Sequence, residues 1–455
     1  MHPYLCSLVC VLGLLLGFAA LPAGAGGLDF TLHRLGGDQT PGVLVVGGIQ
    51  GDEPGGFSAA TLLITHYRIK KGTVWVVPNL NFPSIIQRSR GLHGDMNRKF
   101  AALAETDPEY ATVRRIQELI RTPGLGLVLN LHDGGGFYCP ERKSKERNPS
   151  RWGQCLIIDM AEMSRPDDRP DGHLERRGDA ALAVANTRLL KPEHRLHLKN
   201  TRTHLGNPEM EKSLTWYAVR HGVPAFGLEA SKNFSVEVRA YYHLLMLEAL
   251  LAQSGVTFER AFELSPRGVA AALRDDVRVA FNGDRVLLPL DNARPRLGGS
   301  IPLHRGAMTD MRASKPILAV TRDRNEVAVH YGNRVLTRFK PDWREADTGL
   351  AGLTLVVDGQ RRFVRFGEVV DVKQHFLVEP VRNYRVNAIG ADYGPDESGR
   401  RLSRRDFKNR YSLDRDSRTY RVETYRGQRF AGMILVRFGQ PAQRETGRTH
   451  LVRLP

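Results

Sequence analysis

Cysteine is scarce in this sequence: it contains four in 455 residues, and Cys6 and Cys10 fall within the first ten positions. So few cysteines in a chain of this size exclude a disulfide-rich fold. The other two, Cys139 and Cys155, could close one bridge in an oxidising compartment, and the sequence leaves the bridge and two free thiols equally open. Neither has a Cys or His neighbour at zinc-finger spacing, which excludes a structural zinc module there.

Charged side chains are absent from residues 1–25, where the run from Leu8 to Leu21 is almost wholly apolar. Residues 23–25, Ala-Gly-Ala, are small residues of the kind that a signal peptidase requires, so we expect residues 1–25 to be a signal peptide. An uncleaved membrane anchor is the alternative. No later segment approaches the ~20 apolar residues of a membrane span. The sequence therefore predicts an exported protein with no transmembrane segment after signal cleavage.

Acidic residues are in deficit, with 49 Asp and Glu against 66 Lys and Arg, and the formal net charge is +17. The excess is concentrated in residues 400–455, which hold 15 basic and 5 acidic side chains. A basic domain can bind nucleic acid, but export and the lack of a recognisable nucleic-acid module count against this, so no nucleic-acid partner is expected. Wall polymer, lipid headgroups or a protein could meet this basic C-terminal region, and a solvated basic face is an equally good interpretation.

The length predicts two or three domains. Up to about residue 254, apolar strand-like runs alternate with amphipathic helices, which is typical of an α/β sheet covered by helices. Beyond it, short β-prone runs separated by turn dipeptides take over. We expect an α/β domain over residues 26–254 and small all-β domains over residues 255–346 and 347–455, with a long polar loop at residues 388–419. The strands expected in the first domain are Gly42–Gly48, Thr73–Pro78, Gly126–His132, Cys155–Met160 and Pro224–Glu229, and the helices are Pro54–Tyr67, Pro108–Arg121, Gly178–Leu190, Pro208–His221 and Val236–Gln253.

Two polar segments follow expected strands of the first domain. The loop Gly47–Gly56 places Gln50 and Glu53 after one strand, at the carboxyl edge where open α/β sheets bind ligands and metals. His132 ends a later apolar strand and is followed by Asp133 and three glycines. A polar turn and a strand-end His are also ordinary structural features, so neither segment identifies a site by itself.

Two further segments place polar and charged groups at turns and strand ends. Asn97 and Arg98 lie beside a turn, and such a pair suits capture of a carboxylate. Glu229 ends an apolar strand, where a charged group is costly unless it is paired or functional. Thr215 lies on an expected helix before that strand and could line a substrate pocket, although core packing is the more frequent use of such a position.

Together, in this order, the four segments resemble the zinc metallocarboxypeptidases and their relatives, the aspartoacylase and succinylglutamate desuccinylase amidohydrolases. That superfamily combines an H-x-x-E zinc loop, a later strand-end His, an Arg upstream of an Asn-Arg pair and a strand-end Glu base. Arg90 stands seven residues before Asn97, the spacing of the amidohydrolase branch. In residues 47–56 a Gln replaces the first His. This loop is similar to that of the exported D,L-carboxypeptidases that trim peptidoglycan in curved and helical bacteria.

The resemblance implies a fold and a metal site. The fold would be a carboxypeptidase-like mixed α/β sheet flanked by helices, followed by a β-barrel-like domain and an immunoglobulin-like domain. Zn²⁺ would be held by Gln50, Glu53 and His132, the three protein ligands of an open catalytic site. Because an amide is a weaker donor than imidazole, the ion would be held less tightly and remain a stronger Lewis acid. Asp52 and Asp133 adjoin ligands, and either could orient His132.

The resemblance also implies catalytic and binding roles. Glu229 would be the general base. Arg90 would polarise the scissile carbonyl, with Arg88 as the alternative. Asn97 and Arg98 would hold the terminal carboxylate of the substrate, which makes the enzyme an exopeptidase.

The implied activity is that of a periplasmic zinc D,L-carboxypeptidase that affects cell shape. It would trim the muropeptide stem L-Ala-D-Glu-meso-diaminopimelate to a dipeptide by releasing meso-diaminopimelate. Two alternatives stay open. One is an amidohydrolase of the aspartoacylase type that acts on a small acyl amino acid. The other is a metal-free wall-binding protein in which Gln50 marks a lost metal site.

Overall fold

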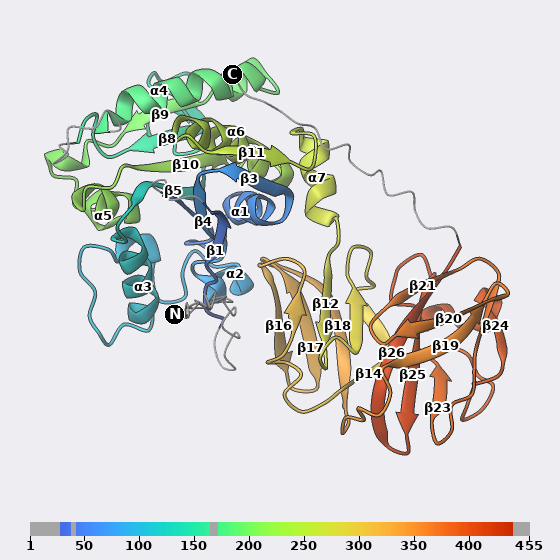
Figure 1. Cartoon of the computed structure of the whole chain (residues 1–455). Helices are drawn as coiled ribbons and strands as arrows, with labels where there is room; N and C mark the ends of the chain where they lie inside the picture. Colours follow the sequence, from blue (N-terminus) through green and yellow to red (C-terminus); the bar gives the residue numbers. More distant parts are fainter. Residues whose placement is uncertain (1–27, 38–41, 164–171, 440–455) are drawn as a thin grey trace, which may run out of the picture.

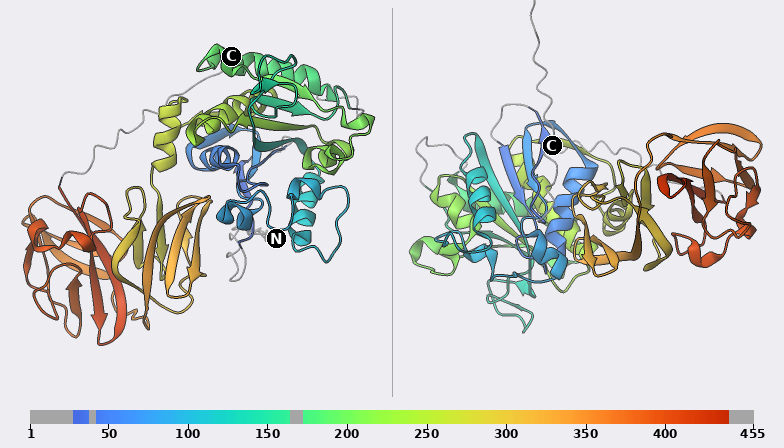
Figure 2. Two further views of the ribbon diagram at one scale, coloured as in Figure 1. Left: turned by 180° about the vertical axis from the view of Figure 1, so that it is seen from behind. Right: turned by 90° about the horizontal axis from the view of Figure 1, so that it is seen from below.

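The structure is a computed structural model that describes residues 28–37, 42–163 and 172–439 (Figure 1). The expected signal peptide and the last sixteen positions, residues 440–455, lie outside these ranges. An α/β unit comes first, and two β-rich parts follow it, the middle one lying between the α/β unit and the C-terminal one (Figures 1 and 2). Among the described residues, no helix combines the length and the apolar character needed to cross a bilayer.

A seven-stranded mixed sheet lies at the centre of the α/β unit, in the order β1-β4-β2-β5-β10-β8-β9. Strands β4, β2, β5 and β10 are parallel, whereas β1 is antiparallel to β4 and β8 is antiparallel to β10. All five residues of β2 are buried, as in a strand covered on both faces. The mixed α/β sheet predicted from the sequence is confirmed. The strands are β1 His33–Gly36, β2 Gly42–Val46, β4 Thr73–Val77, β5 Leu125–Gly134, β8 Cys155–Ile158, β9 His197–Asn200 and β10 Ala225–Ser231.

Helices α1 and α4 both pack against the long helix α6, and α5 packs against β5 and β10. The described helices of this unit are α1 Pro54–His66, α2 Phe82–Gln87, α3 Tyr110–Ile120, α4 Leu174–Ala185, α5 Leu214–Arg220, α6 Val236–Gln253 and α7 Pro266–Arg274. Two small sheets complete it, one from β3 Tyr67–Lys71 and β11 Thr257–Arg260, the other from β6 Phe137–Tyr138 and β7 Arg147–Asn148.

The buried core of the α/β unit continues beyond residue 254, where we expected the first domain to end. It runs as far as Leu273, because β11 pairs with β3 and α7 packs on α6 and α1. A buried polar contact reinforces this junction. Glu248 of α6 accepts hydrogen bonds from Arg260 in β11, at 2.8 Å, and from Tyr67 in β3, at 2.6 Å. Residues 255–274 therefore pack with the α/β unit rather than with the β-rich part that follows.

The middle part consists of a three-stranded and a four-stranded sheet around one buried cluster. No hydrogen-bonded ladder joins the two sheets in the described residues, so the part has a barrel-like shared core without being a closed barrel. The same cluster includes Ile85 and Ile86 of α2, so the middle part supports the segment that runs from α2 into the site. The strands are β12 Arg278–Phe281, β13 Val286–Pro289, β14 Arg296–Leu303, β15 Arg312–Ala313, β16 Leu318–Asp323, β17 Glu326–Tyr331 and β18 Arg334–Trp343.

The C-terminal part is a sandwich of two four-stranded sheets that share a third buried cluster, in keeping with the expected immunoglobulin-like arrangement. Asp358 and Gly359 both have positive φ and connect the first two strands, so this Asp-Gly pair is one of the turn dipeptides expected between β-prone runs. The strands are β19 Gly352–Val357, β20 Gln360–Arg365, β21 Val369–Val372, β22 His375–Val378, β23 Arg385–Ala388, β24 Arg401–Ser403, β25 Thr419–Arg426 and β26 Arg429–Phe438.

Candidate active site

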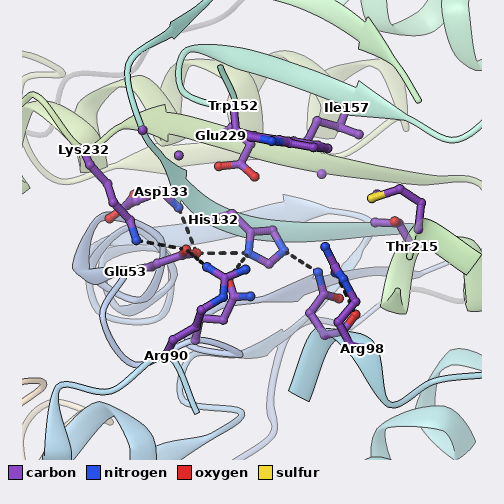
Figure 3. A pocket seen from close by; sticks show the side chains of 16 residues that line it. Glu53, Arg90, Arg98, His132, Asp133, Trp152, Ile157, Thr215, Glu229 and Lys232 are labelled. Carbon is purple, nitrogen blue, oxygen red and sulfur yellow. Dashed lines mark hydrogen bonds and ion pairs between the residues drawn. The ribbon is translucent and has the colours of Figure 1, made fainter. Parts of the chain in front are cut away.

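The carboxyl ends of three parallel strands bring the predicted residues together. Gln50 and Glu53 follow β2, His132 lies near the end of β5, and Glu229 lies near the end of β10. Glu229 is directly beside His132 in the register of the β5–β10 pair. A cavity of about 230 Å³ opens here, and all eight residues predicted to form the site line it (Figure 3): Gln50, Glu53, Arg90, Asn97, Arg98, His132, Thr215 and Glu229.

The loop after β2 is shaped by glycines and by the start of α1. A side chain at Gly51 would collide with the backbone of Ser84, because its Cβ would lie 2.1 Å from that carbonyl group, so the loop can lie against α2 only with glycine there. Gly55 donates its backbone N–H to Asp133, at 2.8 Å. Helix α1 begins with Pro54 at its first position, immediately after Glu53. These constraints fix Gln50 and Glu53 at the edge of the sheet.

Three buried side chains converge where a metal was predicted. His132 Nδ1 lies 3.0 Å from Gln50 Oε1 and 3.1 Å from Glu53 Oε2. Donor atoms around a tetrahedral zinc ion with bonds near 2.0–2.1 Å are separated by about 3.3 Å, so these separations are close to those of a zinc site. No group of three His, Cys, Asp or Glu side chains in the described ranges could hold a metal ion. A metal bound by Glu53 and His132 would therefore take its third protein donor from the amide of Gln50.

The surroundings of Nε2, on the far side of the His132 ring, also suit a histidine that binds a metal through Nδ1. Asn130 Nδ2 lies 2.8 Å from His132 Nε2, and Asn130 Oδ1 is buried without a hydrogen-bond partner. An imidazole that binds a metal through Nδ1 carries its proton on Nε2. Rotating the Asn130 amide by half a turn would present the unpaired oxygen to that proton. Asp52 and Asp133, the residues predicted to orient His132, make their side-chain contacts elsewhere, with Lys232 and with Arg239 and His243.

Two cations contact the other oxygen of Glu53. Arg90 Nη1 lies 3.3 Å and Lys232 Nζ 3.4 Å from Glu53 Oε1, and Lys232 also contacts Asp52 at 2.8 Å. Burial lowers the pKa of Lys232, but the charges of Glu53 and Asp52 outweigh burial and raise this pKa overall. Lys232 thus remains a cation at the rim of the site. The sequence reasoning missed this residue, whose only signal is its position three residues after Glu229.

Arg90, rather than Arg88, lies at the cavity. The Arg90 guanidinium donates to Asp95 Oδ2 from Nε at 3.1 Å and from Nη2 at 2.9 Å. Arg88 ends α2 in the left-handed conformation, and its Nε donates to the carbonyl of Asn333 in the middle part. Its side chain is therefore directed away from the cavity.

The Asn97–Arg98 pair lies on a one-turn 3-10 helix, Met96–Arg98. Asn97 Oδ1 accepts the backbone N–H of Leu214 at 3.0 Å, which turns the Nδ2 side of its amide toward His132. Arg98 and Thr215 lie on one side of His132 and Lys232 lies on the other (Figure 3). The Arg98 guanidinium is 3.7 Å from the exposed carboxylate of Glu209. This end of the cavity therefore offers a cation beside an amide and a hydroxyl.

Glu229 is a buried carboxyl group with an unpaired oxygen. Its Oε2 has no hydrogen-bond partner among the described residues. Burial raises the pKa of Glu229 well above its ordinary 4.5, and the negative charges of Glu53 and Asp133 raise it further. A carboxyl group tuned upward in this way suits proton transfer near neutral pH.

The raised pKa of Glu229 predicts a pH-dependent stability difference in the metal-free protein. The folded state keeps this proton to a higher pH than the unfolded chain, so ionisation of Glu229 opposes folding increasingly as the pH rises above 4.5. Glu229→Gln removes the penalty. We expect its Tm to match that of the original protein near pH 4.5 and to exceed it at pH 7–8, by ~1–2 °C for each kcal/mol. Thermal unfolding in excess chelator measures this.

Glu237 provides a control of opposite sign. Its pKa is lowered despite burial, which by itself would raise the value, because the carboxylate is hydrogen-bonded at the start of α6. The stabilisation from Glu237 is therefore present above 4.5 and lost as the pH falls. Glu237→Gln should lower Tm at pH 7–8. A Tm of Glu229→Gln that stays below the original value at every pH would contradict the assignment.

Cys139 and Cys155 are free thiols, and both are buried. Cys155 begins β8, and its Sγ donates to the carbonyl of Trp152 at 3.1 Å. Trp152 itself lines the cavity. The structure thus decides the question that the sequence left open, and no disulfide links Cys139 to Cys155.

Two protein-family models match parts of the chain. The model described as "carboxypeptidase controlling helical cell shape, catalytic" covers residues 31–274, more than half of the sequence. The chain belongs to this family. A second model, the C-terminal domain of metallo-carboxypeptidase, covers residues 346–439. The protein is therefore a metallocarboxypeptidase, and the first match ends where the buried core of the α/β unit ends.

Solved structures of one bacterial protein resemble this carboxypeptidase over nearly its whole length. The apo form of cell shape determinant protein Csd4 from Helicobacter pylori is 39% identical, with a TM-score of 0.84, and the match covers 90% of this chain and 100% of that one. A tripeptide-bound Csd4 gives the same values. The mDAP-bound form of Csd4, described as a D,L-carboxypeptidase, is 40% identical with a TM-score of 0.83, over 88% of this chain and 97% of that one. The comparison with curated proteins finds no match.

Proposed function

We propose that this carboxypeptidase is a zinc D,L-carboxypeptidase of the periplasm. It releases meso-diaminopimelate from the peptidoglycan tripeptide stem L-Ala-D-Glu-meso-diaminopimelate, leaves a dipeptide and thereby affects cell shape. One observation carries the proposal: a single cavity joins three convergent donor groups, a buried carboxyl group and an Asn-Arg pair. The likeness to Csd4, which has been solved with a tripeptide and with mDAP, supports the same substrate here.

We propose a role for each of the side chains that line the cavity. A zinc ion held by Gln50, Glu53 and His132 would supply Lewis acidity and an activated water. Glu229 takes a proton from the attacking water onto its carboxylate and delivers it to the leaving amine. Arg90 donates its guanidinium N–H groups to the oxygen that gains charge as the carbonyl becomes tetrahedral.

Specificity for a chain end follows from the opposite side of His132. Arg98 and Asn97 offer N–H donors to a free carboxylate, and Thr215 lines the same end. When these donors bind the free carboxylate at the end of the substrate, the amide bond that lies beside Glu229 is the last amide bond of the substrate. The enzyme therefore removes one terminal residue rather than cleaving internally.

The proposal is tested by digesting purified tripeptide muropeptides and following the products by chromatography and mass spectrometry. We expect dipeptide stems and free meso-diaminopimelate. Replacing Arg98 with Met should lower kcat/KM by roughly 30- to 150-fold, because a hydrogen-bonded charged contact contributes about 2–3 kcal/mol. Lys212→Met is the matched control. This variant removes a neighbouring positive charge, which pairs with Glu209. Neither Lys212 nor Glu209 lines the cavity, so kcat/KM should stay nearly unchanged.

Two other outcomes would replace the proposal. Intact tripeptides together with hydrolysis of an acyl amino acid would identify an amidohydrolase of the aspartoacylase type. Intact tripeptides, no bound zinc and retention on purified cell wall would identify a wall-binding protein.

Export and the C-terminal contacts stay predictions. Residues 1–25, on which export rests, lie outside the described residues, and cleavage would be read from the N-terminus of the mature protein. Part of the basic excess near the C-terminus is used internally: Arg421 is buried against Glu423 at 2.9 Å, and Arg437 pairs with Asp371 at 2.6 Å. Exposed basic side chains of this region could meet wall polymer or a protein.

A further inference from the structure

Asp95 contacts both a predicted metal ligand and a predicted catalytic residue. Its Oδ1 accepts a hydrogen bond from Gln50 Nε2 at 2.7 Å and another from the backbone N–H of Asn97 at 3.0 Å. Its Oδ2 accepts two hydrogen bonds from the guanidinium of Arg90. Asp95 also precedes the one-turn helix Met96–Arg98 as its N-cap. This carboxylate therefore links three of the segments that form the site.

The contact with Gln50 matters because an amide has two ends of nearly equal size and opposite polarity. Only the oxygen can bind a metal, whereas the NH₂ group is a donor with no lone pair to offer. A carboxylate is an acceptor on both oxygens, so it attracts the NH₂ end and repels the oxygen end. With Nε2 held by Asp95, Oε1 is directed at His132 Nδ1, 3.0 Å away.

The position of Asp95 is fixed by its own surroundings. The turn before it depends on Gly91, whose Cβ would lie 1.8 Å from the carbonyl oxygen of Gly94, and on Gly94, which has a φ of +94°. The backbone N–H of Asn97 holds one carboxylate oxygen, and Arg90 holds the other from Nε and Nη2. Contacts that do not involve Gln50 therefore already orient this carboxylate, as is required of a group that positions a metal ligand.

We propose that Asp95 is the positioning residue that makes Gln50 a metal ligand, by holding the amide with its oxygen toward the metal site. This inference rests on the proposed zinc site. It adds that the Gln-x-x-Glu loop binds metal only in combination with an acceptor at position 95. The same carboxylate aligns Arg90, so one side chain sets both the metal ligand and the group that meets the carbonyl oxygen of the substrate.

The test is a double-mutant cycle that exchanges carboxylate and amide between the two positions. In Asp95→Asn a single amide oxygen replaces two carboxylate oxygens, and Arg90, with two N–H donors, competes for it with Gln50 and the backbone N–H of Asn97. Where Arg90 holds this oxygen, the new NH₂ group faces Gln50 and favours the flipped orientation. We expect zinc affinity, measured by competition with a chromogenic chelator, to fall at least ~10-fold, as for other groups that orient metal ligands. In the Gln50→Glu background the ligand has two equivalent oxygens, and the same Asp95→Asn change removes repulsion between carboxylates. There we expect the affinity to stay equal or rise.

A loss of zinc affinity in the Gln50 background that is absent in the Gln50→Glu background is the signature of amide orientation. Asp107→Asn is the matched control, because Asp107 also accepts a backbone N–H and a cation, from Glu109 and Lys99, without touching a predicted metal ligand. It should leave zinc affinity unchanged, and circular dichroism checks that each variant is folded. Unchanged affinity in Asp95→Asn, or an equal loss in both backgrounds, would overturn the proposal. The original protein is the separate test of the zinc site itself, since failure of that protein to bind zinc would overturn the proposed function instead.

Discussion

Replacing Glu229 with Gln is expected to lower kcat on the tripeptide muropeptide by roughly 10²- to 10⁴-fold, the contribution of a positioned general acid–base group. Gln has the shape of Glu but cannot take a proton from water or deliver it to an amine. Glu229 lies beside His132 in neighbouring parallel strands, so the same group can serve both proton transfers without moving far. Steady-state release of meso-diaminopimelate measures the effect.

The controls separate chemistry from binding and folding. Zinc stoichiometry and affinity for the tripeptide should be retained in Glu229→Gln, because neither depends on the proton. Cys155 is the cross-strand neighbour of Glu229 in the β8–β10 pair, and Cys155→Ala should keep most of the original kcat. A kcat of Glu229→Gln within tenfold of the original would show that another group is the base. In that case the raised pKa of Glu229 would affect only the pH dependence of stability.

The sequence predicts best those elements whose ends coincide with a local signal in the sequence, such as Gly or Pro. Strands β2 and β4 are continuous apolar runs bounded by Gly or Pro, and α6 spans the predicted residues, Val236–Gln253. Helix α5 begins later than predicted, at Leu214, because the Ser213 side chain accepts the N–H of Trp216 and caps it there.

Helix α4 illustrates a limit of local signals. We expected it to start at Gly178, whereas it starts at Leu174 and carries this glycine in its interior. A Cβ at Gly178 would lie 2.6 Å from the side chain of Leu198 in β9. The glycine therefore allows close contact between helix and strand and does not mark a helix end. That contact joins residues far apart in the chain, so no local pattern could reveal it.

The residues predicted to form the site lie at strand ends or in turns, apart from Thr215 in α5, and they meet at one cavity. Their supporting groups were not predictable, because they depend on long-range packing. The choice between Arg88 and Arg90 is made by a contact with Asn333 in the middle part. Asp95 lies within the turn segment that carries Asn97, yet its contact with Gln50 spans 45 positions and exists only in the folded chain.

Removal of the metal is expected to abolish turnover of the tripeptide. The three convergent donors, Gln50, Glu53 and His132, would hold the zinc that acts as the Lewis acid, and without it Glu229 alone would activate water weakly. Dialysis against a chelator should reduce the release of meso-diaminopimelate to background. One equivalent of Zn²⁺ per chain should restore it, measured with the same assay and by metal analysis.

Gln50→His provides the graded control for metal removal, because an imidazole binds zinc more strongly than an amide oxygen does. We expect this variant to retain zinc at chelator concentrations that strip the original protein. If activity instead persists in metal-free protein, Gln50 does not serve the reaction as a ligand and the loop is a vestige of a zinc site. If activity is lost with the metal and Gln50→His shifts the chelator midpoint upward, the glutamine is a working ligand, weaker by its chemistry than the histidine it replaces.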